Sequence, residues 1–155
     1  MNSEEIVKLY TQRLIELDNL SELNELKSSY YQEMICWLDK FVTYFSKVDK
    51  KSSYTHITYN RIYSIVNPIE NNQLKIFINN LLILNILNDH FQACNLISEE
   101  VIAIDKEWLD YCILNQLYID PFSDESISKE NFSRMISRYF SFTEEFKEYL
   151  EYDFS

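Results

Sequence analysis

The most restrictive feature of this sequence is the absence of glycine from all 155 residues. Glycine adopts positive φ angles without strain and lets a backbone approach a ligand closely. Phosphate-binding loops of the GxxxxGK(S/T) and GxGxxG types, the GxSxG turn of hydrolases and the usual EF-hand loop all depend on it, so these sites are excluded. Asparagine tolerates left-handed backbone best among the remaining residues, and we expect helix ends and turns to use Asn19, Asn67, Asn88 and Asn95.

The most apolar segment, IFINNLLILNIL at 76–87, indicates where the core lies. A membrane-spanning helix needs about 20 predominantly apolar residues, whereas this segment has 12, three of which are asparagine. A helix that is apolar nearly all round is expected at the centre of a domain, with neighbours on several sides. We therefore predict a buried central helix at about 72–88, whose asparagines are structural; a ligand pocket around them is the alternative.

Apolar residues recur at helical spacing on both sides of this segment. The pattern predicts helices at about 3–18, 21–48, 58–66, 105–117, 132–139 and 141–152. Strand-like runs at 91–96 and 101–104 leave room for one small β-hairpin. We predict a mainly α fold: a single domain over 1–155, built as a helical bundle around the central helix at about 72–88, with the hairpin at about 91–104 in a winged-helix-like layout.

The order of helix 58–66, helix 71–88 and hairpin 91–104 resembles a winged helix-turn-helix in layout. The resemblance implies a transcription regulator that binds DNA through residues 50–75. The candidate DNA contacts in that range are Lys50, Lys51, His56, Arg61 and Lys75.

The charges in this region disfavour DNA binding. A DNA reader presents Arg, Lys, Asn or Gln to the bases and neutralises phosphates with flanking cations. Lys75 is the only basic residue between Arg61 and Lys106, and the hairpin carries Glu99 and Glu100, which repel phosphates. A winged-helix regulator is therefore the alternative interpretation of function.

Negative charge is concentrated in the C-terminal half of the chain. The formal net charge is −11, and residues 81–155 contribute −10 of it with fifteen acidic and five basic residues. The segment RYFSFTEEFKEYLEYDFS interleaves carboxylates with aromatic rings, a combination that steers a basic partner protein and then anchors it. The predicted partner-binding residues are Tyr139, Glu144, Glu145, Glu148, Tyr149, Glu151, Tyr152 and Asp153.

A plainer alternative exists for this segment. A terminal helix can pack Phe142, Phe146, Tyr149 and Leu150 inward and leave its glutamates in water. In either case the net charge disfavours nucleic acid and anionic membranes as partners.

Histidine and cysteine residues do not form a recognisable catalytic or metal-binding motif. His56 and His90 are the only histidines, and neither belongs to a motif such as HExxH. His90, Cys94 and Cys112 provide an incomplete zinc-ligand pattern. A nucleophilic Cys-His pair formed in three dimensions stays open, but no spacing favours it.

One group of carboxylates, Asp105, Glu107 and Asp110, has helical spacing. This spacing is typical of a capped helix start rather than of paired acid-base carboxylates. We therefore expect no catalytic residue, no metal and no cofactor, and a protein that is not an enzyme. A small hydrolase or nuclease assembled from scattered residues is the remaining catalytic alternative.

The cysteines and the N-terminus indicate a compartment. Cys36, Cys94 and Cys112 are an odd set in apolar surroundings without a CxxC pair, so we interpret them as buried free thiols in a reducing environment. The first residues lack the apolar run of a signal peptide. We expect the cytoplasm of a cell or of an infected host cell, and the composition resembles that of proteins from AT-rich bacteria, phages and large DNA viruses.

Together these features favour a non-enzymatic acidic protein-binding module. An inhibitor, an immunity-type protein or an adaptor that engages a basic surface of a partner protein fits them best.

Overall fold

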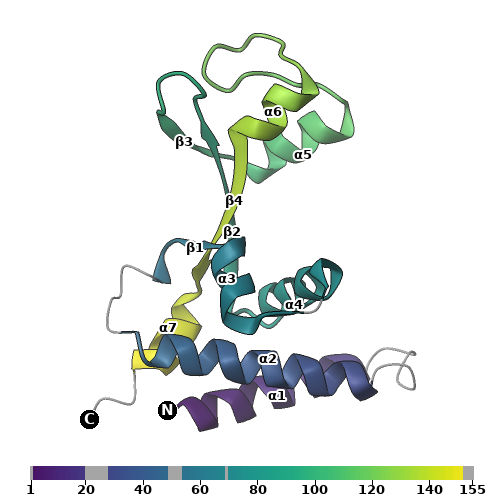
Figure 1. The fold of residues 1–155 in the computed structure, drawn as a ribbon, viewed down its shortest axis with the longest axis vertical. Helices are drawn as coiled ribbons and strands as arrows, with labels where there is room; N and C mark the ends of the chain where they lie inside the picture. Colours follow the sequence, from purple (N-terminus) through teal and green to yellow (C-terminus); the bar gives the residue numbers. More distant parts are fainter. Residues whose placement is uncertain (1, 20–27, 49–53, 69, 152–155) are drawn as a thin grey trace. The chain divides into compact units, whose positions relative to one another are not determined.

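The computed structural model describes residues 2–19, 28–48, 54–68 and 70–151. These residues form seven helices and four strands, shown in Figure 1. The helices are α1 (Ser3–Asn19), α2 (Ser28–Ser46), α3 (Tyr59–Val66), α4 (Asn71–Ile83), α5 (Lys106–Leu114), α6 (Lys129–Met135) and α7 (Glu144–Glu151). The strands are β1 (Ile57–Thr58), β2 (Leu87–Cys94), β3 (Val101–Ile104) and β4 (Ile136–Phe142).

The chain forms two compact units. Unit 1 contains Met1–Asn88 and Ser141–Ser155, and unit 2 contains Asp89–Phe140. Each boundary between the units falls within a strand, either β2 or β4. The single domain expected over 1–155 stays a prediction.

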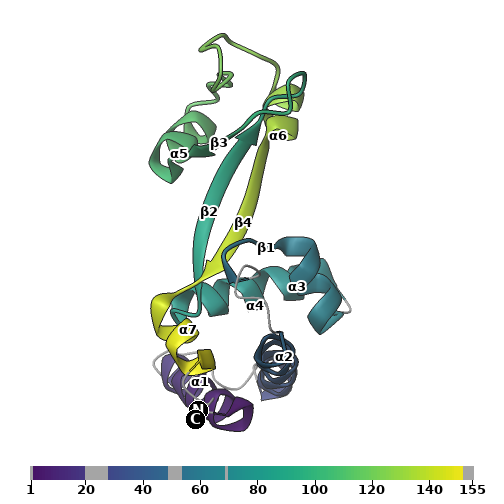
Figure 2. The same ribbon diagram turned by 90° about the vertical axis from the view of Figure 1, so that its left-hand side faces the viewer.

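The fold is mixed α/β, so the prediction of a mainly α helical bundle is wrong. The four strands form an antiparallel sheet in the order β1-β4-β2-β3, and Figure 2 shows β2 and β4 side by side. The largest error concerns β4, because the apolar spacing of Phe132, Met135, Ile136 and Tyr139 predicts one continuous helix. In the structure α6 ends at Met135, and the following strand buries Phe140 and Phe142, two positions apart, which suits a half-buried strand.

The predicted central helix ends five residues earlier than 72–88 implies. α4 stops at Ile83, and the chain enters β2 at Leu87. Asn85 has a φ of 60°, the N–H of Asn85 donates to Leu82 O, and the N–H of Ile86 donates to Leu81 O. These two hydrogen bonds around a left-handed residue form a Schellman motif, in which asparagine takes the place that glycine usually holds.

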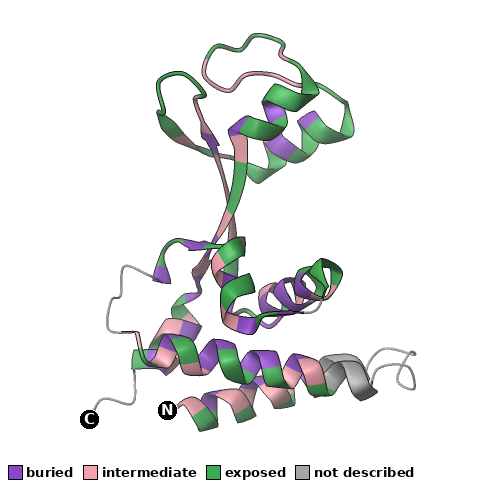
Figure 3. Cartoon of the chain, in the orientation of Figure 1, coloured by how far each residue is buried: buried purple, intermediate pink, exposed green. Residues whose placement is uncertain are grey.

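α4 is buried on one side only, which also differs from the prediction. Leu74, Phe77 and Leu81 are buried, whereas Ile76 and Ile83 are exposed. Figure 3 shows buried and exposed positions along the same helix. The apolar residues of the 76–87 segment therefore serve the core of unit 1 only in part.

The left-handed positions agree only partly with the asparagines we expected. Positive φ occurs among the described residues at Asn67, Asn85, Glu99, Gln116 and Asp124. The prediction is confirmed for Asn67, which ends α3 and donates its N–H to Tyr63 O at 2.8 Å. It is wrong for Asn88, which lies in β2. Asn95 does serve the predicted turn, between β2 and β3, but without a positive φ; its side chain accepts hydrogen bonds from the backbone of Ile97 and Ser98. Asn19 is the last residue of α1.

The core of unit 1 contains a connected cluster of aromatic side chains. The ring of Phe142 lies 4.7 Å from that of Phe45 and 4.7 Å from that of Phe146, measured between centroids. Phe41 contacts Phe77 of α4 at 6.1 Å. Residues from both ends of the chain thus complete one core, and Figure 1 shows α1 and α2 lying side by side within it.

Unit 2 contains the predicted hairpin and a smaller core. β2 pairs with β3 in an antiparallel register from Phe91 opposite Ile104 to Cys94 opposite Val101, which confirms the strand pair expected within 91–104. Leu109 and Cys112 of α5 are buried against Phe132 of α6. The hairpin is nevertheless one part of a four-stranded sheet and not an isolated feature of a helical bundle.

Candidate functional site

The predicted partner-binding residues are distributed over both units. Tyr139 lies on β4 within unit 2, where its ring stacks on His90 with a centroid distance of 4.9 Å and an interplanar angle of 16°. Glu144, Glu145, Glu148, Tyr149 and Glu151 lie on α7 of unit 1. Tyr152 and Asp153 lie outside the described residues.

α7 begins at Glu144, three residues later than the helix predicted at 141–152. Its first turn is capped by Thr143, whose Oγ1 accepts a hydrogen bond from the N–H of Phe146 at 3.2 Å. The same hydroxyl donates to the backbone oxygen of Asn85 at 2.6 Å. Thr143 is buried, and both functions of its hydroxyl hold α7 against the end of α4.

Glu145 is bound by residues of its own chain. Its Oε1 lies 2.9 Å from Nη1 of Arg13 and accepts a 3.3 Å hydrogen bond from the hydroxyl of Tyr149, while its Oε2 accepts from Nδ2 of Asn85 at 2.9 Å. The hydrogen bond from Asn85, together with the Arg13 guanidinium, lowers the pKa of the Glu145 carboxyl. Glu145 and Tyr149 therefore stabilise unit 1, and these contacts occupy the groups that we predicted would face a partner.

No pattern in the sequence predicts that Arg13 and Asn85 bind Glu145. Arg13 lies 132 residues away along the chain and Asn85 lies 60 residues away. Neither residue shares a periodic pattern with α7. Only the folded arrangement of α1, α4 and α7 brings the three side chains together.

Three other glutamates of α7 form an outward acidic stripe. Glu144, Glu148 and Glu151 are exposed and recur at steps of four and three residues, so they share one face of the helix. Glu144 accepts a short hydrogen bond of 2.6 Å from Nζ of Lys147, although its side chain is 85% exposed. This stripe is the part of the predicted face that the structure leaves open to solvent.

A second surface, on unit 2, was not predicted from the sequence. Four large apolar side chains at the C-terminal end of α5 and just beyond it are exposed, and we call them the α5 patch: Tyr111, Ile113, Leu114 and Leu117. Leu114 is 83% exposed. Glu107 and Asp110 precede the patch by one helical turn, so carboxylates border it on the same helix.

A third feature, in unit 1, is a helix-turn-helix between two strands. β1 leads into α3, residues 67–70 connect α3 to α4, and β2 follows. Thr58 caps α3 through a hydrogen bond to the N–H of Arg61, and Glu70 with Gln73 forms a capping box at the start of α4. The exposed positions of α4 include Asn72, Lys75 and Asn79, and the helix contains no acidic residue.

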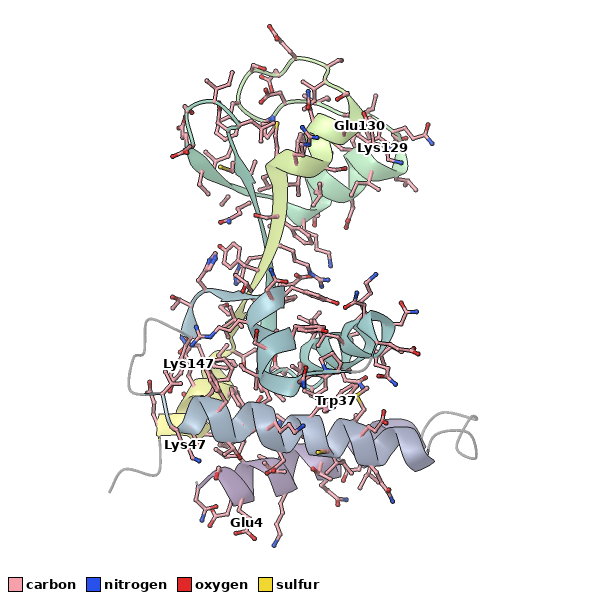
Figure 4. All side chains as sticks on the ribbon, viewed as in Figure 1. Glu4, Trp37, Lys47, Lys129, Glu130 and Lys147 are labelled. Carbon is pink, nitrogen blue, oxygen red and sulfur yellow. The ribbon has the colours of Figure 1, made fainter. Side chains whose placement is uncertain are left out.

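A groove of about 520 Å³ lies between α2 and α3 of unit 1, and we call it the α2–α3 groove. Its lining residues come from one side of each helix: Asp39, Lys40, Thr43, Tyr44, Lys47, Arg61, Ser64 and Ile65. Figure 4 shows Lys47 at the C-terminal end of α2. Among the described residues of the DNA-binding prediction, which exclude Lys50 and Lys51, Arg61 alone lines this groove.

The residues considered for metal binding or catalysis do not assemble. Within the described part of the chain, no three His, Cys, Asp or Glu side chains form a group able to hold a metal ion. Cys112 is buried in the core of unit 2, and burial raises the pKa of its thiol. Cys94 faces the backbone oxygen of Asn95, and Cys36 is exposed, so the prediction of a buried thiol is wrong for Cys36.

None of the helices formed by described residues combines the length and the hydrophobicity that a bilayer crossing requires. We find no match to this chain among protein-family models, curated proteins or solved structures.

Proposed function

We propose that this chain is a non-enzymatic protein-binding module that engages a basic surface of a partner protein. The observation that carries this proposal is the α5 patch, with Leu114 83% exposed beside the carboxylates of α5. Contiguous exposed apolar side chains mark interaction surfaces in folded proteins. A polar, charged rim around an apolar centre is the usual composition of such a surface.

Charge determines the kind of partner that fits. Unit 2 carries ten acidic and four basic residues, counted over 89–140, so its net charge is −6. A basic protein surface is attracted to this unit at long range, and apolar contact with the α5 patch then holds the complex. An inhibitor, an immunity-type protein or an adaptor acts in this way.

The test compares two pairs of matched variants. The full-length chain is tagged, used to capture partners from an extract of its source, and the captured protein is purified and titrated by calorimetry. Ile113→Ser with Leu114→Ser should weaken binding by at least about tenfold, since buried apolar anchors dominate interface energy. Ile76→Ser with Ile83→Ser removes two exposed isoleucines from unit 1 and should leave the affinity unchanged.

Salt and the α7 stripe provide a second readout. Raising the salt concentration should slow association with a basic partner, because exposed charges act mainly on the association rate. Replacing Glu144, Glu148 and Glu151 by glutamine tests whether the α7 stripe contributes to this effect. If the α5 variant and the α4 variant bind equally well, the proposal is wrong.

A second candidate, a DNA-binding regulator, is favoured by the helix-turn-helix of α3 and α4. Asparagine and lysine on the open face of α4 are residue types that read base edges and contact phosphates. Fluorescence anisotropy on a random DNA duplex at low salt separates the candidates, since a DNA reader binds nonspecifically there and releases DNA steeply as salt rises. Absence of binding to the duplex would eliminate this candidate.

A further inference from the structure

The α2–α3 groove gathers positive charge on an acidic protein. Lys40, Lys47 and Arg61 line it, and Asp39 is the only acidic residue among the described residues of its lining. The chain as a whole has a formal net charge of −11. The groove therefore carries a local positive charge, opposite in sign to the net charge of the chain.

The ion pairs of the described residues do not involve these cations, Lys40, Lys47 and Arg61. Three cations that share one groove with a single carboxylate, Asp39, leave a net positive charge there, and a bound anion would neutralise it. The groove is therefore complementary to an anion rather than to a basic partner.

Aromatic rings hold Arg61 in place. Its guanidinium carbon lies 5.6 Å from the centroid of Tyr44 and 5.4 Å from that of Phe45, and its Nη2 donates to the Tyr44 hydroxyl at 3.3 Å. A guanidinium has five N–H donors, so most of them remain for a ligand. Because the Tyr44 oxygen accepts from Arg61, its own proton is available to donate to an anion.

The dimensions of the groove indicate more than a bare anion. Ligand sites for small molecules typically enclose about 300–1,000 Å³, and this groove measures about 520 Å³. The side chain of Ile65 and the ring of Tyr44 provide apolar surface next to the cations. An organic group attached to the anion would contact this surface.

We propose that the α2–α3 groove binds a phosphate ester, with Lys40, Lys47 and Arg61 contacting its oxygens. Arg binds phosphate in a planar, bidentate manner, and Lys adds point charges. The phosphate belongs either to a small organic phosphate or to a nucleic acid backbone, since both present the same oxygens. This inference goes beyond the proposed function, because it concerns another surface in the other unit.

The experiment titrates the full-length protein by calorimetry with three probes: inorganic pyrophosphate, ATP and a short DNA duplex. At least one probe should bind, and Lys40→Gln with Lys47→Gln should weaken that binding by about tenfold or more. Lys8→Gln with Lys129→Gln is the control, because both lysines are exposed, lie outside the groove and change the net charge equally. Melting curves followed by circular dichroism verify that both variants fold.

The probes distinguish the source of the phosphate. Groove-dependent binding of ATP identifies a small organic phosphate, and groove-dependent binding of the duplex alone identifies a nucleic acid backbone; both results support the site. Binding of pyrophosphate without binding of ATP or the duplex would contradict a phosphate ester as the ligand. Asp39→Asn should strengthen binding by about twofold to fivefold, since it removes a repelling carboxylate. Failure of all three probes to bind, an equal loss in the control variant, or weaker binding by Asp39→Asn would overturn the proposal.

Discussion

Nη1 of Arg13 lies 2.9 Å from Oε1 of Glu145, so an ion pair joins the first and the last helix of unit 1. About one third of each side chain is exposed, at 34% for Arg13 and 33% for Glu145. The pair also includes the amide of Asn85, which donates to the other carboxylate oxygen. The carboxylate thus holds three elements of unit 1 together, and its removal affects all of them.

Replacement of Glu145 should destabilise unit 1. Glu145→Ala leaves Arg13, Asn85 and Tyr149 without their shared acceptor, and we expect the free energy of unfolding to fall by about 1–2 kcal/mol. Glu144→Ala is the control, because Glu144 is exposed and contacts only a neighbouring turn; its cost should stay within about 0.5 kcal/mol. Urea denaturation measures both. Equal stability of the two variants would contradict a structural role for Glu145.

The lowered pKa of the Glu145 carboxyl predicts that the free energy of unfolding depends on pH. Its folded-state pKa is lowered relative to the unfolded value of about 4.3. Stability from this group is therefore fully present above about pH 4.3 and is lost as the pH falls through the folded-state pKa. Wild type should lose more stability than Glu145→Gln between neutral pH and pH 3 in urea titrations, and parallel pH curves for the two proteins would contradict the lowered pKa.

Replacing Gln116 by glycine should stabilise this chain, whose sequence contains no glycine. This residue has a φ of 54° where α5 ends, and a side chain with a Cβ is strained there. Gln116→Gly should raise the free energy of unfolding by about 0.5–1 kcal/mol, after allowance for the greater freedom of glycine in the unfolded state. Asn115→Gly is the matched control, because Asn115 has a negative φ and gains no relief. If thermal melts show that Gln116→Gly and Asn115→Gly both lose stability, the positive φ of Gln116 does not strain the backbone and the prediction is wrong.

The exposed fractions of two leucines on α5 predict how much each side chain contributes to the free energy of unfolding. Leu114 is 83% exposed and Leu109, on the same helix, is 3% exposed. Leu114→Ala should change stability by no more than about 0.5 kcal/mol, whereas Leu109→Ala should cost about 2–5 kcal/mol. Denaturation monitored by circular dichroism measures the difference. A large loss for Leu114→Ala would indicate that the patch is part of the core of unit 2.

Local patterns in the sequence were sufficient for most helices and for the hairpin. The predicted helices at 3–18 and 58–66 correspond to α1 and α3, and the strand runs at 91–96 and 101–104 pair as expected. The 132–139 segment was misassigned because its apolar spacing continues that of α6. Pairing with β1 and β2 makes it a strand, and these partners are distant in the chain.

The candidate sites were harder to predict than the elements that carry them. Sequence composition identified α7 as acidic, but it did not indicate that Arg13 neutralises Glu145. The α5 patch looks like an ordinary apolar stripe in the sequence, and only burial distinguishes Leu114 from Leu109. The α2–α3 groove joins residues about 20 positions apart on two helices, without a shared motif.

Unit 1 consists of two segments of the chain, and because translation starts at the N-terminus these segments are synthesised at different times. Unit 2 is continuous from Asp89 to Phe140, so all of its residues are synthesised before Phe142 and Phe146. Until then the rings of Phe41 and Phe45 lack their contacts with Phe142. A chain that ends before Phe142 therefore leaves part of the aromatic core of α2 uncovered, and uncovered apolar surface makes partly folded chains prone to aggregation.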